Sequence, residues 1–175
     1  MKKTSQLVYM SLLVAQALVL HIFEGMIPVP FVTPGAKLGL ANLITVIGLY
    51  TLDKKRDVFV IIILRLTLAT MFGGNLSSFM YSFTGALLSF IIMVIVKKIG
   101  GNNISIIGVS CSGAVFHNVG QLLIASWIVR NIGVMLYLPI LSLIGILTGF
   151  FIGLTANYAL KHMYKLPYFK KNIRS

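Results

Sequence analysis

The stretch PVPFVTPGAKLGLAN, residues 28–42, interrupts an otherwise apolar chain with three prolines, two glycines and one lysine. Proline removes a backbone donor and disfavours helical structure in the residue before it. The apolar run that begins at Leu7 must therefore stop near Met26, and a new helix can begin only near Gly35. Two apolar helices thus meet at this break, and the rest of the chain is organised around it.

Polar side chains accompany this break. Glu24 precedes it, and Lys37 and Asn42 lie within it. Hydrocarbon tolerates such groups only where they face other parts of the protein or a water-filled cavity. We therefore expect a polar site where the first two apolar helices meet.

The composition indicates an integral membrane protein. Of the 175 residues, 58% are hydrophobic and only 10% are charged, too few polar residues to cover the surface of a soluble domain. The net charge of +12 sits in short basic clusters between apolar runs, as in loops that face anionic lipid headgroups, so we exclude nucleic acid as a partner. The single cysteine, Cys111, has no partner within the chain for a disulfide. We expect one transmembrane domain over residues 1–175.

The apolar runs predict an all-α bundle of six transmembrane helices. A span needs about 20 apolar residues, which places the helices at 7–27, 36–52, 58–72, 79–96, 104–129 and 133–160. If six helices alternate in direction, twelve of the fifteen basic residues fall on one side; the exceptions are Lys37, Arg65 and Arg130. The positive-inside rule then places both termini in the cytoplasm of a multi-pass protein.

Small residues indicate where helices pack closely. Gly145, Gly149 and Gly153 repeat every four residues, and we favour packing within the bundle as their role. Ser11 and Ala15 form a shorter stripe on the first helix. For that stripe, packing within the bundle and docking to another subunit both remain open.

Two ionisable residues, Arg65 and His117, lie inside the predicted helices. Arg65 would cost at least ~2.5 to 3.5 kcal/mol at the centre of a lipid-facing helix, so it should face Glu24 or an anionic ligand. His117 shares one helix face with Gly113 and Gln121, and the glycine would leave space for a pocket open to the outside. A core histidine bonded to a neighbouring helix is the alternative interpretation of His117.

The candidate substrate-binding residues are the polar side chains inside the spans or at their outer ends: Glu24, Lys37, Asn42, Arg65, Asn75, His117, Asn118 and Gln121.

Signatures of catalysis are absent from the sequence. The three acidic residues, Glu24, Asp53 and Asp57, provide no carboxylate pair of the kind that holds Mg²⁺ on a diphosphate. The three histidines are not spaced as a metal site. Gly73-Gly74-Asn75 lacks the Gly-Lys-Ser/Thr of a phosphate loop. We therefore expect no catalytic residue, metal or cofactor, and any ATP hydrolysis would need another subunit.

Four motifs carry a resemblance to a known family. They are PGAKLGLAN at 34–42, LRL at 64–66, SFMYS at 78–82 with Gly85, and GAVFHNVGQ at 113–121. Together they resemble the Gx transporter family, which is also labelled heptaprenyl diphosphate synthase component I. In length and six-helix plan the chain is similar to the substrate-binding S components of energy-coupling factor (ECF) transporters.

This resemblance implies a bacterial cytoplasmic membrane protein that binds a small micronutrient or anionic metabolite in an outward-facing pocket. It also implies docking of the first helix onto a transmembrane coupling subunit served by two ATPases. Ser11 and Ala15 match the family's alanine-rich docking motif, with serine in place of the first alanine.

Two other functions remain as alternatives. The chain could be a non-catalytic accessory subunit in isoprenoid, quinone or flavin redox metabolism. The synthase label would otherwise imply a prenyl transferase, but the aspartate-rich motifs of those enzymes are missing, so at most the chain accompanies such an enzyme.

Overall fold

The computed structural model describes residues 3–26, 39–72, 75–101, 103–166 and 169. Within these ranges the protein is helical and has no strand. Its six α-helices and one 3₁₀-helix run in the order α1 (Lys3–Gly25), α2 (Asn42–Thr51), α3 (Lys55–Met71), α4 (Leu76–Gly100), α5 (Ile106–Val129), η1 (Ile132–Tyr137) and α6 (Leu138–Met163).

Helix α2 begins later than the sequence predicts. A start at residue 36 is wrong, because residues 39–41 are not helical. Gly39 has φ +86°, a left-handed conformation that a right-handed helix cannot contain. The backbone N–H groups of Gly39 and Leu40 donate to the side chain of Glu24. The break therefore extends to the residue before Asn42.

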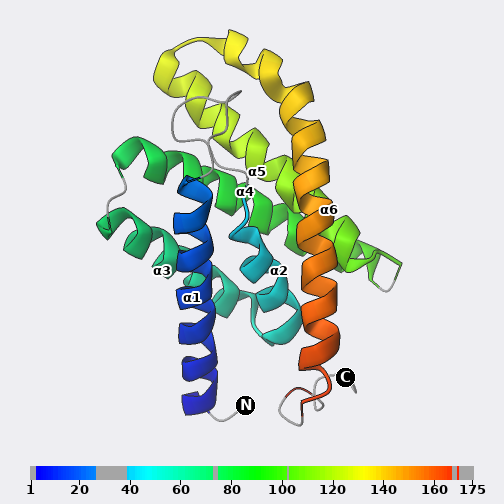
Figure 1. The fold of residues 1–175 in the computed structure, drawn as a ribbon. Coiled ribbons are helices and arrows are strands. Elements are labelled where there is room, and N and C mark those ends of the chain that lie inside the picture. Colours follow the sequence, from blue (N-terminus) through cyan, green and yellow to red (C-terminus); the bar gives the residue numbers. More distant parts are fainter. Residues whose placement is uncertain (1–2, 27–38, 73–74, 102, 167–168, 170–175) are drawn as a thin grey trace.

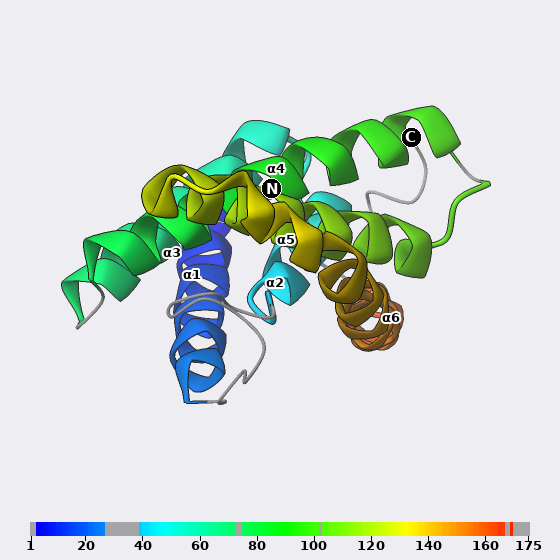
Figure 2. The same cartoon turned by 90° about the horizontal axis from the view of Figure 1, so that it is seen from above.

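Helix α2 is nevertheless the centre of the fold. Eight of its ten residues are buried, and it contacts each of the other five α-helices. In the view from above, α2 lies between α1 and α6 (Figure 2). By contrast, α1 buries only five of its 23 residues.

Glycines set the packing of α5 against its neighbours. A Cβ atom at Gly149 or Gly153 would lie 2.6 Å from the Cα atom of Cys111 or Ile107, respectively. A Cβ atom at Gly145 would lie 2.9 Å from Nδ2 of Asn118. Only glycine allows α6 to approach α5 this closely, which confirms the predicted role of this stripe in packing within the bundle.

Four of the helices are long and apolar enough to cross a bilayer: α1, α4, α5 and the continuous η1–α6 segment. Helix α2 is apolar but would be only about 15 Å long at 1.5 Å per residue. Helix α3 carries Lys55, Arg56 and Asp57 in its first turn. The described residues thus define a helical membrane protein with at least these four candidate spans.

The described helices place most of the basic residues together. Helix α1 begins and α6 ends at the same end of the molecule, at the bottom of Figure 1. Side-chain contacts gather the ends of α2, α4 and α6 there: Lys97 donates to the carbonyl of Leu49, and the Tyr164 hydroxyl donates to the carbonyl of Tyr50. We call this the basic end; its described basic residues are Lys3, Lys54, Lys55, Arg56, Lys97, Lys98, Lys161 and Lys165.

Candidate functional site

A buried carboxylate joins α1 to the segment before α2. Glu24 lies in the last turn of α1, and its Oε1 accepts hydrogen bonds from the backbone N–H groups of Gly39 and of Leu40, the latter at 3.1 Å. These bonds satisfy two backbone donors in the non-helical residues that precede α2. Glu24 therefore helps to fix the position of Gly39.

The imidazole of His117 lies between two glycines. A Cβ atom at Gly39 would be 3.1 Å from Cδ2 of His117, and one at Gly85 of α4 would be 2.9 Å from Cε1 and Nδ1. The same Cβ atom at Gly39 would be 3.0 Å from Nδ2 of Asn42. Because neither glycine has a side chain, α4 and the segment just before α2 can both approach the His117 ring of α5.

Arg65 brings α3 to the same place. The guanidinium is buried, and the charge of Glu24 acts on it electrostatically. We call the set formed by Glu24, Gly39, Asn42, Arg65, Gly85 and His117 the polar cluster. Its four polar members, Glu24, Asn42, Arg65 and His117, are each only 3% exposed.

Two donors of the polar cluster have no partner in the part of the chain that the structure describes. Nε of Arg65 and Nδ2 of Asn42 are buried and have no hydrogen-bond partner among the described residues. A buried donor without a partner costs about 1 to 3 kcal/mol. The cluster can therefore offer hydrogen bonds and positive charge to an added group with acceptor atoms.

The other predicted site residues take different places. Gln121 is buried one turn beyond His117 on α5. Asn118 donates to the carbonyl of Leu141 at 2.6 Å, which ties α5 to α6. Asn75 is exposed and caps α4, accepting from the N–H of Ser78 at 2.7 Å. Lys37 lies outside the described residues.

The expected open space beside Gly113 is filled. A Cβ atom there would lie 2.5 Å from Cγ of Met93 and 3.0 Å from Oγ of Ser89, both on α4. The glycine thus permits close packing of α4 on α5 instead of leaving part of a pocket open. Helical spacing correctly indicated a shared face but could not show which neighbour covers it.

Sequence reasoning did not include Gly39, Gly85 or Ser82 in the site. Gly85 lies inside a helix, where glycine costs about 1 kcal/mol relative to alanine, so its presence there was a signal of close packing. Ser82 lies one turn before Gly85, and its buried Oγ has no hydrogen-bond partner within the described part of the chain. Motifs containing all three were quoted above, but their contacts depend on other helices.

The predicted docking residues lie on an exposed face of α1. Ser11 and Ala15 are one turn apart and both exposed, and the Ser11 hydroxyl donates to the carbonyl of Leu7 at 3.0 Å. Exposed Val8, Leu12 and Val19 accompany them. This face is available to lipid or to another subunit.

Metal binding finds no support in the residues that the structure describes, because no three His, Cys, Asp or Glu side chains gather there as a metal site would require.

These features define a helical membrane protein with a buried polar cluster. Residues 13–160 match the family model for heptaprenyl diphosphate synthase component I, and the chain belongs to that family. Neither the search of curated proteins nor the search of solved structures found a match.

Proposed function

We propose that the protein is the substrate-binding membrane subunit of an ECF-type importer, with the polar cluster as its ligand site. The observation that carries this proposal is the pair of buried, unused donors on Arg65 and Asn42. A ligand with carboxylate, phosphate or carbonyl oxygens would supply the acceptors that these donors lack. The substrate class is therefore a small anionic or strongly hydrogen-bonding metabolite.

We also propose a membrane topology for the protein. Six segments cross the bacterial cytoplasmic membrane, and α2 belongs to the second of them. Both termini and the basic end face the cytoplasm, as the positive-inside rule requires. The polar cluster then lies in the outer half of the protein, the side from which an importer takes its substrate.

The partners are a transmembrane coupling subunit and ATPase subunits. The exposed face around Ser11 and Ala15 suits docking, because small side chains allow another helix to approach closely. The chain itself is not an enzyme in this proposal. Purified protein should show no Mg²⁺-dependent prenyl transfer.

Ligand binding is tested by an untargeted mass-spectrometric search for small molecules that gently purified protein retains. We expect an anionic or acceptor-rich compound to accompany wild-type protein and to be displaced when the same pure compound is added in labelled form. Retention of no compound, together with no binding of candidate micronutrients after reconstitution, would contradict the proposal.

Docking is tested by co-purification with a coupling module expressed alongside. Ala15→Trp places a large ring on the exposed face of α1 and should reduce the recovered complex severalfold. Ile146→Trp is the matched control, because Ile146 is also exposed but lies on α6. Equal recovery of the complex with both variants would place the interface elsewhere.

A second candidate is a non-catalytic accessory subunit in isoprenoid, quinone or flavin redox metabolism. The family description, component I of heptaprenyl diphosphate synthase, favours it. This function needs a soluble enzyme as partner and no small-molecule site. Capture of a defined soluble synthase or flavoprotein, at equal yield with Arg65→Ala, would support it over transport.

A further inference from the structure

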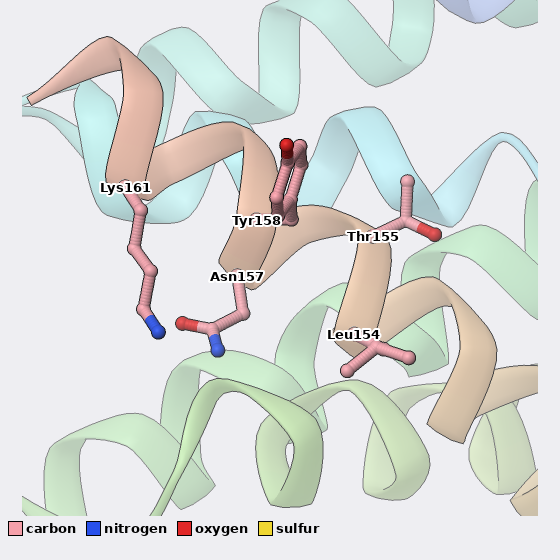
Figure 3. A pocket seen from close by; sticks show the side chains of 5 residues that line it. All are labelled: Leu154, Thr155, Asn157, Tyr158 and Lys161. Atoms are coloured by element: carbon pink, nitrogen blue, oxygen red, sulfur yellow. The ribbon is translucent and has the colours of Figure 1, made fainter.

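A pocket lies along the C-terminal half of α6, away from the polar cluster. It has a volume of 460 Å³ and is lined by Leu154, Thr155, Asn157, Tyr158 and Lys161 (Figure 3). Because Gly145 packs at Asn118 and Gly153 packs at Ile107, the pocket begins about two helical turns beyond the level of His117. It therefore belongs to the half of α6 that approaches the basic end.

The lining changes from apolar to cationic along the helix. Leu154 lies at the inner end, and the surface before it continues through exposed Leu147, Phe150 and Phe151. Lys161 lies in the last turn of α6. Between these ends, Asn157 provides an amide group. Thr155 and Tyr158 extend to the other side of the helix, and the Thr155 hydroxyl donates to the carbonyl of Phe151 at 2.8 Å.

Asn157 and Lys161 are positioned to act together. They are four residues apart, so they project from the same face of α6. Figure 3 shows the amide of Asn157 and the ammonium group of Lys161 extending to the same side, with Leu154 farther along the helix. None of the chain's three acidic residues lies within α6, so no carboxylate on this helix competes for Lys161.

We propose that this pocket binds an anionic glycerophospholipid from the leaflet next to the basic end. Lys161 and Asn157 contact the phosphate, and one acyl chain follows α6 past Leu154. A free phosphate would use only the cationic end, whereas the apolar surface continues toward the membrane centre. The long side chain of Lys161 can keep its charge at the interface while its methylene groups cover apolar surface.

The binding is tested with full-length purified protein by native mass spectrometry, using added phosphatidylglycerol and phosphatidylcholine with identical acyl chains. Wild-type protein should retain phosphatidylglycerol preferentially. Lys161→Gln should lower phosphatidylglycerol binding about fivefold, the size expected for one lysine near an anionic membrane surface, and should lower the binding of zwitterionic phosphatidylcholine much less. Asn157→Ala removes a neutral contact to the phosphate that both lipids carry, so it should lower the binding of both.

The matched control is Lys54→Gln, which removes one exposed charge from the basic end without altering the pocket. It should bind phosphatidylglycerol as wild-type protein does. If Lys161→Gln and Lys54→Gln lowered phosphatidylglycerol binding equally, the preference would be due to general charge attraction, and the proposal would be overturned. Equal binding of the two lipids by wild-type protein, or full displacement of phosphatidylglycerol by millimolar inorganic phosphate, would overturn it as well.

Discussion

The two ends of α2 differ in how fully their polar groups are bonded. At the basic end, the carbonyls of Leu49 and Tyr50 accept from Lys97 and Tyr164, and the ammonium group of Lys97 lies 3.9 Å from the centre of the Tyr50 ring. At the other end, the amide Nδ2 of Asn42 is buried and has no hydrogen-bond partner among the described residues.

The two ends of this short helix therefore have different expected roles, one in the stability of the fold and the other in ligand binding. The last carbonyls of a helix lack partners inside it, so the bonds from Lys97 and Tyr164 stabilise the end of α2. The unused donors of Asn42 and Arg65 do the opposite, since burying them costs free energy that a ligand would recover. We therefore expect substitutions at the polar cluster to affect ligand binding and those at the basic end to affect stability.

The largest expected effect is that of Arg65→Gln. Truncating a buried, hydrogen-bonded charge typically costs 2 to 5 kcal/mol in binding, so ligand affinity should fall at least about thirtyfold in an equilibrium binding measurement. Thermal stability in detergent should change little, because glutamine retains a hydrogen-bonding group. Arg56→Gln, at an exposed position of the same helix, should leave ligand affinity unchanged.

A fixed ion pair between Glu24 and Arg65 would give a different result. Breaking a buried pair costs about 3 to 5 kcal/mol in soluble proteins, so Arg65→Gln would then melt much earlier. Glu24→Gln combined with Arg65→Gln would recover much of the loss. A stable Arg65→Gln protein with normal ligand affinity would contradict both roles.

The next largest expected effect is that of Gly85→Ala, which changes the contact of α4 with His117. A Cβ atom in Gly85→Ala would lie 2.9 Å from the His117 ring and 3.0 Å from the His117 carbonyl oxygen. The backbone oxygen cannot move freely, so we expect a loss of about 1 to 3 kcal/mol in stability and weaker ligand binding. Thermal melts and binding titrations measure the two effects.

Gly25→Ala is the matched control for this substitution, because a Cβ atom at Gly25 would meet no atom of the described residues within 4 Å. It should leave both the melting temperature and ligand affinity near their wild-type values. If Gly85→Ala behaves in the same way, the close packing around His117 does not matter for the site.

The smallest expected effect is that of Tyr164→Phe at the basic end. Tyr164→Phe removes the hydroxyl that donates to the carbonyl of Tyr50 at 2.9 Å. A single hydrogen bond contributes about 0.5 to 1.5 kcal/mol, so the melting temperature should fall modestly while ligand affinity stays constant. Tyr137→Phe, at an exposed position, should change neither quantity. A marked loss of ligand affinity in Tyr164→Phe would show that the two ends are not separate.

Local patterns in the sequence were sufficient to predict the positions of the helices and one contact between helices. Apolar runs located all six α-helices, and the four-residue spacing of Gly145, Gly149 and Gly153 identified the face of α6 that packs on α5. Both are properties of neighbouring residues along the chain, which is why they could be predicted.

Contacts between distant segments could not be predicted in the same way. The late start of α2 depends on the left-handed Gly39 and on its bond to Glu24, fifteen residues earlier. The position of the His117 ring depends on glycines in two other segments, and Met93 covers the face at Gly113 that was expected to be open. The same limit applied to Asn75 and Asn118, whose bonds to Ser78 and Leu141 were not evident from their polarity.

The position of α2 has a mechanical consequence. A helix is stiff along its axis, and a ten-residue helix measures about 15 Å. Asn42, at its first residue, and Tyr50, near its last, therefore move as one body. A displacement of Asn42 along the axis would therefore be transmitted to the contacts of Lys97 and Tyr164, so α2 couples the polar cluster to the basic end.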